Sequence, residues 1–199
     1  MQKFTLTAKQ RIQQVKNAQT NFYLGLAALA LLQNHEHYGT LDHVSASIDG
    51  KYGFKFSEAV KLLDHPEAGQ YARQEFLVML FRMMLKEPFE VVKAYAEDNG
   101  VMNELQRQPW FHVARLLRNA VSHDFMFTFR PFDLTLLPLE WNGIRIDAGM
   151  SDKHVAVTDV PIASVKELVS KLRAFLEAYV RKTITPKAGV FAPDSIANG

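Results

Sequence analysis

The stretch that decides the fold is WFHVARLLRNAVSH, residues 110–123, because its apolar and polar residues separate onto two sides of a helix. At about 100° per residue, one side is apolar throughout: Trp110, Val113, Ala114, Leu116, Leu117, Ala120 and Val121. The other side carries the polar residues: His112, Arg115, Arg118, Asn119, Ser122 and His123. Phe111 is the one apolar residue that intrudes on it. The pattern predicts an amphipathic helix packed on an apolar core.

Helical patterns on both sides of this stretch predict a mainly α protein, built as a helical bundle. Residues 8–33 contain no proline and predict a long N-terminal helix, followed by a connection from His35 to Gly53. Residues 70–86 predict a strongly apolar helix. Pro88 is expected either to kink this helix or to start a new one, over residues 89–98. Apolar residues recur at helical spacing between 161 and 182, so we expect a last amphipathic helix there.

A small antiparallel β element is expected before the last helix, at about residues 125–158. The segments FMFTF, LTLL and LEWNGIRID are rich in residues that favour strands. Asn142-Gly143 lies between alternating residues, which is a strong short-range signal for a β-hairpin. We therefore expect one domain over residues 1–182 with this β insertion, and an irregular tail over 183–199.

Composition excludes several classes of protein. The 199 residues include no cysteine, which removes disulfides, thiolate zinc sites and cysteine nucleophiles and favours a reducing compartment such as the cytoplasm. A formal net charge of +2 permits an anionic partner without requiring one. The most apolar run, residues 22–32, is much shorter than the roughly 20 residues of a membrane-spanning helix, so no membrane partner is expected.

The polar side of the helix carries residue types suited to phosphate chemistry. Arginine offers a planar, permanently charged fork, histidine exchanges a proton near neutral pH, and asparagine can orient a neighbour. Arg118 and His123 are five positions apart and diverge by about 140° on a regular helix, so one helix supplies half a site. Two copies that meet at a two-fold axis would complete a symmetric pocket, which predicts a homodimer. The alternative is a solvated helix face without function.

The run Arg118-Asn119-Ala120-Val121-Ser122-His123 resembles the R-polar-x3-H motif of the HEPN superfamily. HEPN proteins are helical bundles, and many are metal-independent ribonucleases, toxins or antiviral effectors. Residues 107–112 also fit a looser form of the motif, but Pro109 places Arg107 outside the helix. The resemblance covers residues 8–124 and the terminal helix, whereas the β element is not a general HEPN feature.

The resemblance implies RNA cleavage by attack of a 2′-hydroxyl on the adjacent phosphorus. His123 would act as general base or acid, Arg118 would stabilise the charge of the phosphorane, and Asn119 would orient a phosphate or the imidazole. Arg115 and Ser122 are the expected RNA-binding residues, although Arg115 fits a solvated surface position as well. No metal or other cofactor is implied. The implied partners are RNA, a second copy of the chain and a nucleotidyltransferase-like antitoxin.

Other functions compete with this interpretation. Some HEPN domains lack catalysis and bind nucleotides, RNA or proteins, and the absence of an extended basic stripe fits such a module. The motif could also be accidental in a structural helical protein. A rival site is His35-Glu36-His37 with Asp42 and His43, a loop whose side chains could ligate a transition metal. Neither a Walker loop nor a G-x-S-x-G elbow occurs in the sequence.

Overall fold

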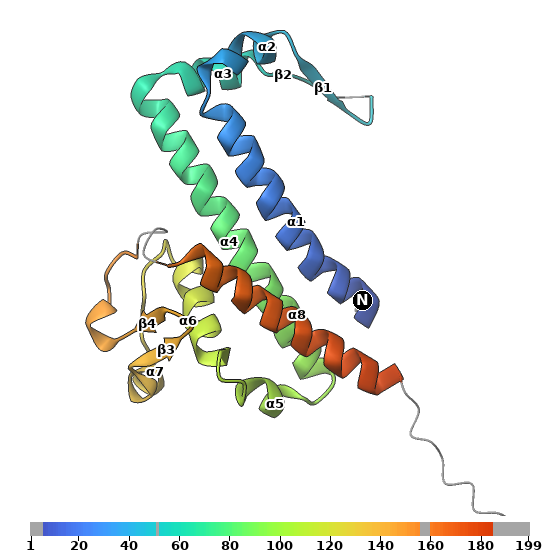
Figure 1. Ribbon diagram of the computed structural model, residues 1–199, viewed down its shortest axis with the longest axis vertical. Helices are drawn as coiled ribbons and strands as arrows, with labels where there is room; N and C mark the ends of the chain where they lie inside the picture. Colours follow the sequence, from blue (N-terminus) through green and yellow to red (C-terminus); the bar gives the residue numbers. More distant parts are fainter. Residues whose placement is uncertain (1–5, 51, 156–159, 185–199) are drawn as a thin grey trace, which may run out of the picture.

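The computed structural model describes residues 6–50, 52–155 and 160–184, and it is mainly helical. Two long antiparallel helices, α1 (Ala8–Leu32) and α4 (Pro66–Asp98), run through the length of the fold (Figure 1). The helices α6 (Phe111–Ser122) and α8 (Ile162–Ile184) pack on α4, and α8 also contacts α1. This arrangement confirms the predicted mainly α, bundle-like fold. Residues 185–199, which make up most of the predicted irregular tail, lie outside the described residues.

Local chemistry explains where the two long helices begin. The Thr7 hydroxyl accepts a hydrogen bond from the Gln10 backbone N–H at 3.3 Å, and the Gln10 side chain accepts from the Thr7 N–H at 2.8 Å. This reciprocal capping box satisfies two backbone donors that the first turn of α1 leaves free. Pro66 begins α4, because its ring suits a first turn where no N–H is needed.

The helix α4 continues through Pro88, so the separate helix expected from Phe89 does not form. Proline in a helix interior removes one hydrogen bond and costs about 3 kcal/mol. Leu85, Pro88 and Phe89 are all buried on the side of α4 that faces the core. Burial of apolar residues before and after Pro88 therefore offsets the free-energy cost of the proline. The sequence pattern alone does not reveal this packing.

The segment expected to connect the first two helices contains regular structure. A 3-10 turn, η1 (His35–His37), leads into α2 (Tyr38–Asp42). Beyond this segment, α3 (Ser57–Asp64) precedes α4. Between α2 and α3, the strand β1 (Ser45–Ile48) pairs antiparallel with β2 (Tyr52–Lys55). This hairpin lies near one end of the α1–α4 pair, far from α6 in Figure 1. The prediction of a plain connection is wrong.

A second hairpin forms where the sequence predicts it. The strand β3 (Leu139–Trp141) pairs antiparallel with β4 (Ile144–Ile146), and Asn142 and Gly143 adopt φ of 46° and 78° in the turn. Two positive φ angles are what the tight hairpin turn requires. The short 3-10 helix η2 (Ala148–Met150) follows β4.

The rest of the expected β element is not sheet. The LTLL segment belongs to helix α7 (Pro131–Leu136), and the FMFTF segment forms only isolated bridges, from Met126 to His154 and from Phe127 to Ser151. Pro131 in the first turn and the Asp133 carboxylate, which accepts a hydrogen bond from the Arg130 N–H, start α7 despite its strand-forming residues. Part of the predicted insertion, residues 156–159, lies outside the described residues.

The helix α6 buries the side that the sequence predicts. All the apolar residues on that side are at most 3% exposed, and they pack in one core with residues of α1, α4 and α8. Phe111 is buried as well, because its ring lies 5.8 Å from the Phe89 ring of α4. Short helix α5 (Met102–Gln106) connects α4 to α6. Within the described ranges, none of the helices combines the length and the apolar character of a membrane span.

Candidate functional site

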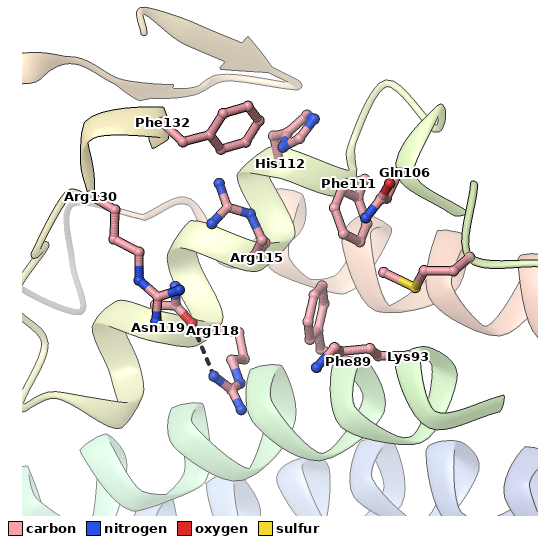
Figure 2. Close-up of a pocket in the computed structure, with 11 residues that line it drawn as sticks. Phe89, Lys93, Gln106, Phe111, His112, Arg115, Arg118, Asn119, Arg130 and Phe132 are labelled. Atoms are coloured by element: carbon pink, nitrogen blue, oxygen red, sulfur yellow. Dashed lines mark hydrogen bonds between the residues drawn. The ribbon is translucent and has the colours of Figure 1, made fainter. Parts of the chain in front are cut away.

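The polar side of α6 lines a cleft of about 450 Å³ (Figure 2). The lining residues come from α4, α5, α6 and the start of α7: Phe89, Lys93, Met102, Gln106, Phe111, His112, Arg115, Arg118, Asn119, Arg130 and Phe132. A volume of this size is typical of small-molecule sites. Four of these side chains are cationic, and none is a carboxylate. The cleft therefore suits an anionic ligand.

Arg118 is held between two helices at the wall of this cleft. Its Nη2 forms an ion pair with Glu90 Oε1 of α4, and its Nη1 donates a hydrogen bond to Asn119 Oδ1 at 3.0 Å. Glu90 Oε1 and the Nε of Arg118 are both buried, and neither has a hydrogen-bond partner among the described residues. Arg118 and Asn119 thus form one unit, as their adjacency on the polar side of α6 suggests.

Arg115 is paired with a buried carboxylate and is not a free surface arginine. Its Nη2 lies 2.5 Å from Oδ1 of Asp133, whose side chain is 1% exposed. Asp133 Oδ2 also accepts a hydrogen bond from the Arg130 backbone N–H at 2.9 Å. Burial raises the pKa of Asp133, but the hydrogen bonds from Arg130 and Arg115 and their positive charges outweigh it and hold the pKa below its ordinary value. The pair fixes α7 against α6.

His112 lies on the same wall, between the rings of Phe111 and Phe132. The ring centroids lie 5.2 Å and 6.3 Å from that of His112. Burial, and next the positive charge of Arg115, lower the pKa of His112, although Asp133 acts in the opposite direction. The imidazole is therefore neutral at pH 7, with one donor and one acceptor nitrogen. Its Nδ1 is buried and has no hydrogen-bond partner in the described part of the chain.

His123 and Ser122 lie outside this cleft. His123 ends α6 with φ −124° and ψ 59°, and its side chain is exposed. Among the described residues, no hydrogen bond, ion pair or ring contact engages its imidazole. The Ser122 hydroxyl donates to the Arg118 backbone carbonyl at 2.9 Å, so it is engaged within its own helix. One chain therefore brings Arg115, Arg118 and Asn119 to the cleft and leaves Ser122 and His123 apart from them.

Several lining residues lie on segments other than α6, outside the motif at residues 118–123. Lys93 and Arg130 add positive charge, and Phe132 adds an aromatic ring from α7. Pro131 followed by Asp133 is a helix-start signal, and it could have shown that Arg130 and Phe132 flank a turn against α6. No local signal marks Lys93, because its place opposite α6 depends on how two distant segments pack.

The residues of the rival metal site do not gather around a common point. His35 Nδ1 lies 3.4 Å from Asp64 Oδ1, and the His35 ring packs on Tyr38 with the centroids 4.8 Å apart. In the described ranges, no group of three or more His, Asp or Glu side chains is close enough together to hold a metal ion. The His35–His43 segment instead packs at the end of the α1–α4 pair.

Comparisons with known proteins give no relative from which a function could be transferred. No family model, no curated protein and no solved structure matches the chain. The function is therefore inferred from the cleft and from the motif at residues 118–123.

Proposed function

We propose that the protein is a metal-independent endoribonuclease of HEPN type that acts as a homodimer. The observation that supports this proposal is that the motif residues lie in two different places. Arg118 is fixed by Glu90 and Asn119 at the wall of a cationic cleft, whereas His123 is exposed at the end of the same helix. A second copy related by a two-fold axis could bring its own His123 to this wall, which would complete a composite site.

In the proposed reaction, the 2′-oxygen of one ribose attacks the adjacent phosphorus and the bond to the 5′-oxygen breaks. A 2′,3′-cyclic phosphate and a free 5′-hydroxyl result. His123 performs one of the two proton transfers, from the 2′-hydroxyl or to the leaving 5′-oxygen, and solvent water performs the other; histidine suits this role near neutral pH. Arg118 donates hydrogen bonds to the phosphorane oxygens, where negative charge grows in the transition state. Asn119 holds the guanidinium in place by accepting from its Nη1.

The direct test is RNA cleavage in the presence of a chelator. We expect the parent to cleave single-stranded RNA, and we expect His123→Ala and Arg118→Ala to lower the rate by about 10²-fold or more, the contribution typical of a positioned acid–base group or an electrostatic donor. His43→Ala removes another exposed histidine, far from the cleft, and should leave the rate unchanged. Cleavage that needs a divalent metal, or that survives His123→Ala, contradicts the proposal.

A second candidate function is binding without cleavage, by a module that recognises nucleotides or RNA. The position of His123 outside the cleft favours this alternative, because the cleft of one chain contains cations and aromatic rings but no group poised for proton transfer to a phosphate ester other than the half-buried His112. A parent protein that binds RNA in the same assay and never cleaves it would establish this function instead.

The proposed biological setting is a cytoplasmic toxin or defence system. A nucleotidyltransferase-like antitoxin is the expected partner, since the proposed ribonuclease would damage its own cell without an inhibitor. Co-expression with the product of an adjoining gene of that type should abolish cleavage. Cleavage that is unchanged by such a product would argue against this partner.

A further inference from the structure

The cleft holds three groups that the reaction proposed above does not use. Arg130 and Phe132 reach it from the start of α7, and His112 lies on its α6 wall (Figure 2). Phe132 is 61% exposed, which is unusual for a large apolar side chain. Each of these groups offers a different contact to a ligand: a charge, a flat apolar face and a hydrogen bond.

Of the four cationic side chains of the cleft, Arg130 is the one without a carboxylate at ion-pair distance among the described residues, although its charge also acts on Asp133 from further away. Arg115 is paired with Asp133, Arg118 with Glu90, and Lys93 with Glu97 at 3.4 Å. Among the described residues no carboxylate forms an ion pair with the Arg130 side chain, which is exposed and points toward the part of α6 that carries Asn119. A guanidinium in this state is well suited to a phosphate group.

Phe132 and His112 are suited to contact the base of a nucleotide. The Phe132 ring is open to water on one side and packs near His112 on the other, so it forms a platform on which a base can stack. The imidazole of His112 lies beside this platform, and because its Nδ1 is buried, a hydrogen bond to a ligand would come from Nε2. Stacking on an aromatic ring requires a base that is not paired in a duplex.

We infer that the cleft binds one unstacked nucleotide of single-stranded RNA, with its phosphate on Arg130 and its base on Phe132. The inference rests on the proposed function, because it places the substrate nucleotide beside the Arg118 wall. It names the substrate class as single-stranded RNA and assigns Arg130, Phe132 and His112 to binding. A duplex fits poorly, because its bases are stacked on one another and not available to Phe132.

The test measures binding of a fluorescein-labelled, single-stranded 2′-O-methyl oligoribonucleotide, which cannot be cleaved by a 2′-hydroxyl mechanism. We expect Arg130→Ala and Phe132→Ala each to raise the Kd about tenfold, since base stacking and phosphate contacts have effects of this order. Arg130→Ala should also lower the slope of log K against log salt by about 1. The same oligonucleotide in a duplex should bind more weakly.

Matched controls separate the cleft from general effects. Arg145→Ala removes an exposed arginine of β4, and Tyr71→Ala removes an exposed ring of α4; neither residue lines the cleft. Both controls should bind as the parent does. A parent that does not bind the probe, or cleft variants that bind as tightly as the controls, would overturn the inference. Loss of binding in the cleft variants, with a parent that never cleaves unmodified RNA, would support the inference and reject the ribonuclease.

Discussion

The middle and the end of α6 differ in how they are held. In the middle, Arg115 and Arg118 are each paired with a carboxylate from another segment, Asp133 and Glu90. At the end, His123 is exposed and its imidazole has no partner among the described residues. The chain thus builds a rigid wall suited to a phosphate and leaves its best proton-transfer group outside. Under the proposed function, the site would be completed by His123 of a second copy.

The largest effect is expected from breaking the buried pair in the middle of α6. Asp133→Ala leaves the Arg115 guanidinium without its carboxylate in a half-buried position, which should lower the free energy of unfolding by about 3 kcal/mol. Urea unfolding measures this change. Glu140→Ala breaks the exposed ion pair with Arg145 and should cost less than about 1 kcal/mol. Equal losses for the two variants would show that the middle of α6 is not specially held.

The same pair gives stability a pH dependence. The pKa of Asp133 is lower in the folded chain than its ordinary value, so folding favours the ionised carboxylate. This stabilisation is complete above the unfolded pKa of about 3.9 and is lost as the pH falls through the lower folded pKa. We expect the stability difference between parent and Asp133→Asn to be constant from pH 7 to about pH 5 and to shrink in stronger acid. A difference that grows as the pH falls would contradict the assigned direction.

A smaller effect is expected at the end of α6. Arg82 Nε donates a hydrogen bond to the Val121 carbonyl at 2.7 Å, and its Nη2 lies 3.5 Å from Asp124. Arg82→Ala should therefore lower the free energy of unfolding by about 1 kcal/mol, as expected for one hydrogen bond to a charged donor at a partly exposed site. Exposed Lys86, one turn further along α4, provides the control Lys86→Ala, for which no loss is expected. If the two variants behave alike, Arg82 does not hold the end of the helix.

The parts of the fold that depend on local chemistry could be predicted from the sequence. The buried side of α6 follows from the spacing of its apolar residues, and the β3–β4 turn follows from Asn142-Gly143. Continuity of α4 through Pro88 could not be predicted, because it depends on the burial of Pro88 and its neighbours against distant segments. Helix α7 forms where the strand-forming residues predict a strand, because Pro131 and Asp133 start a helix there.

The same distinction holds for the candidate site. Arg118, Asn119 and Arg115 share a cleft because they share one side of α6, which the sequence pattern predicts. Lys93, Arg130 and Phe132 join them from α4 and α7, and only tertiary packing brings these segments together. The carboxylates that fix the arginines, Glu90 and Asp133, could not be assigned for the same reason.

The central claim is that Arg118 and His123 act together across two protomers, and mixing of inactive subunits tests it most directly. Arg118→Ala and His123→Ala chains are unfolded or dissociated together, allowed to reassociate, and assayed for RNA cleavage with a chelator present. A mixed dimer that joins the intact Arg118 of one chain to the intact His123 of the other should recover one working site in two. The account predicts activity in the mixture well above the residual activity of either variant alone. A mixture as inactive as its components, in which mixed dimers are shown to be present, would contradict it.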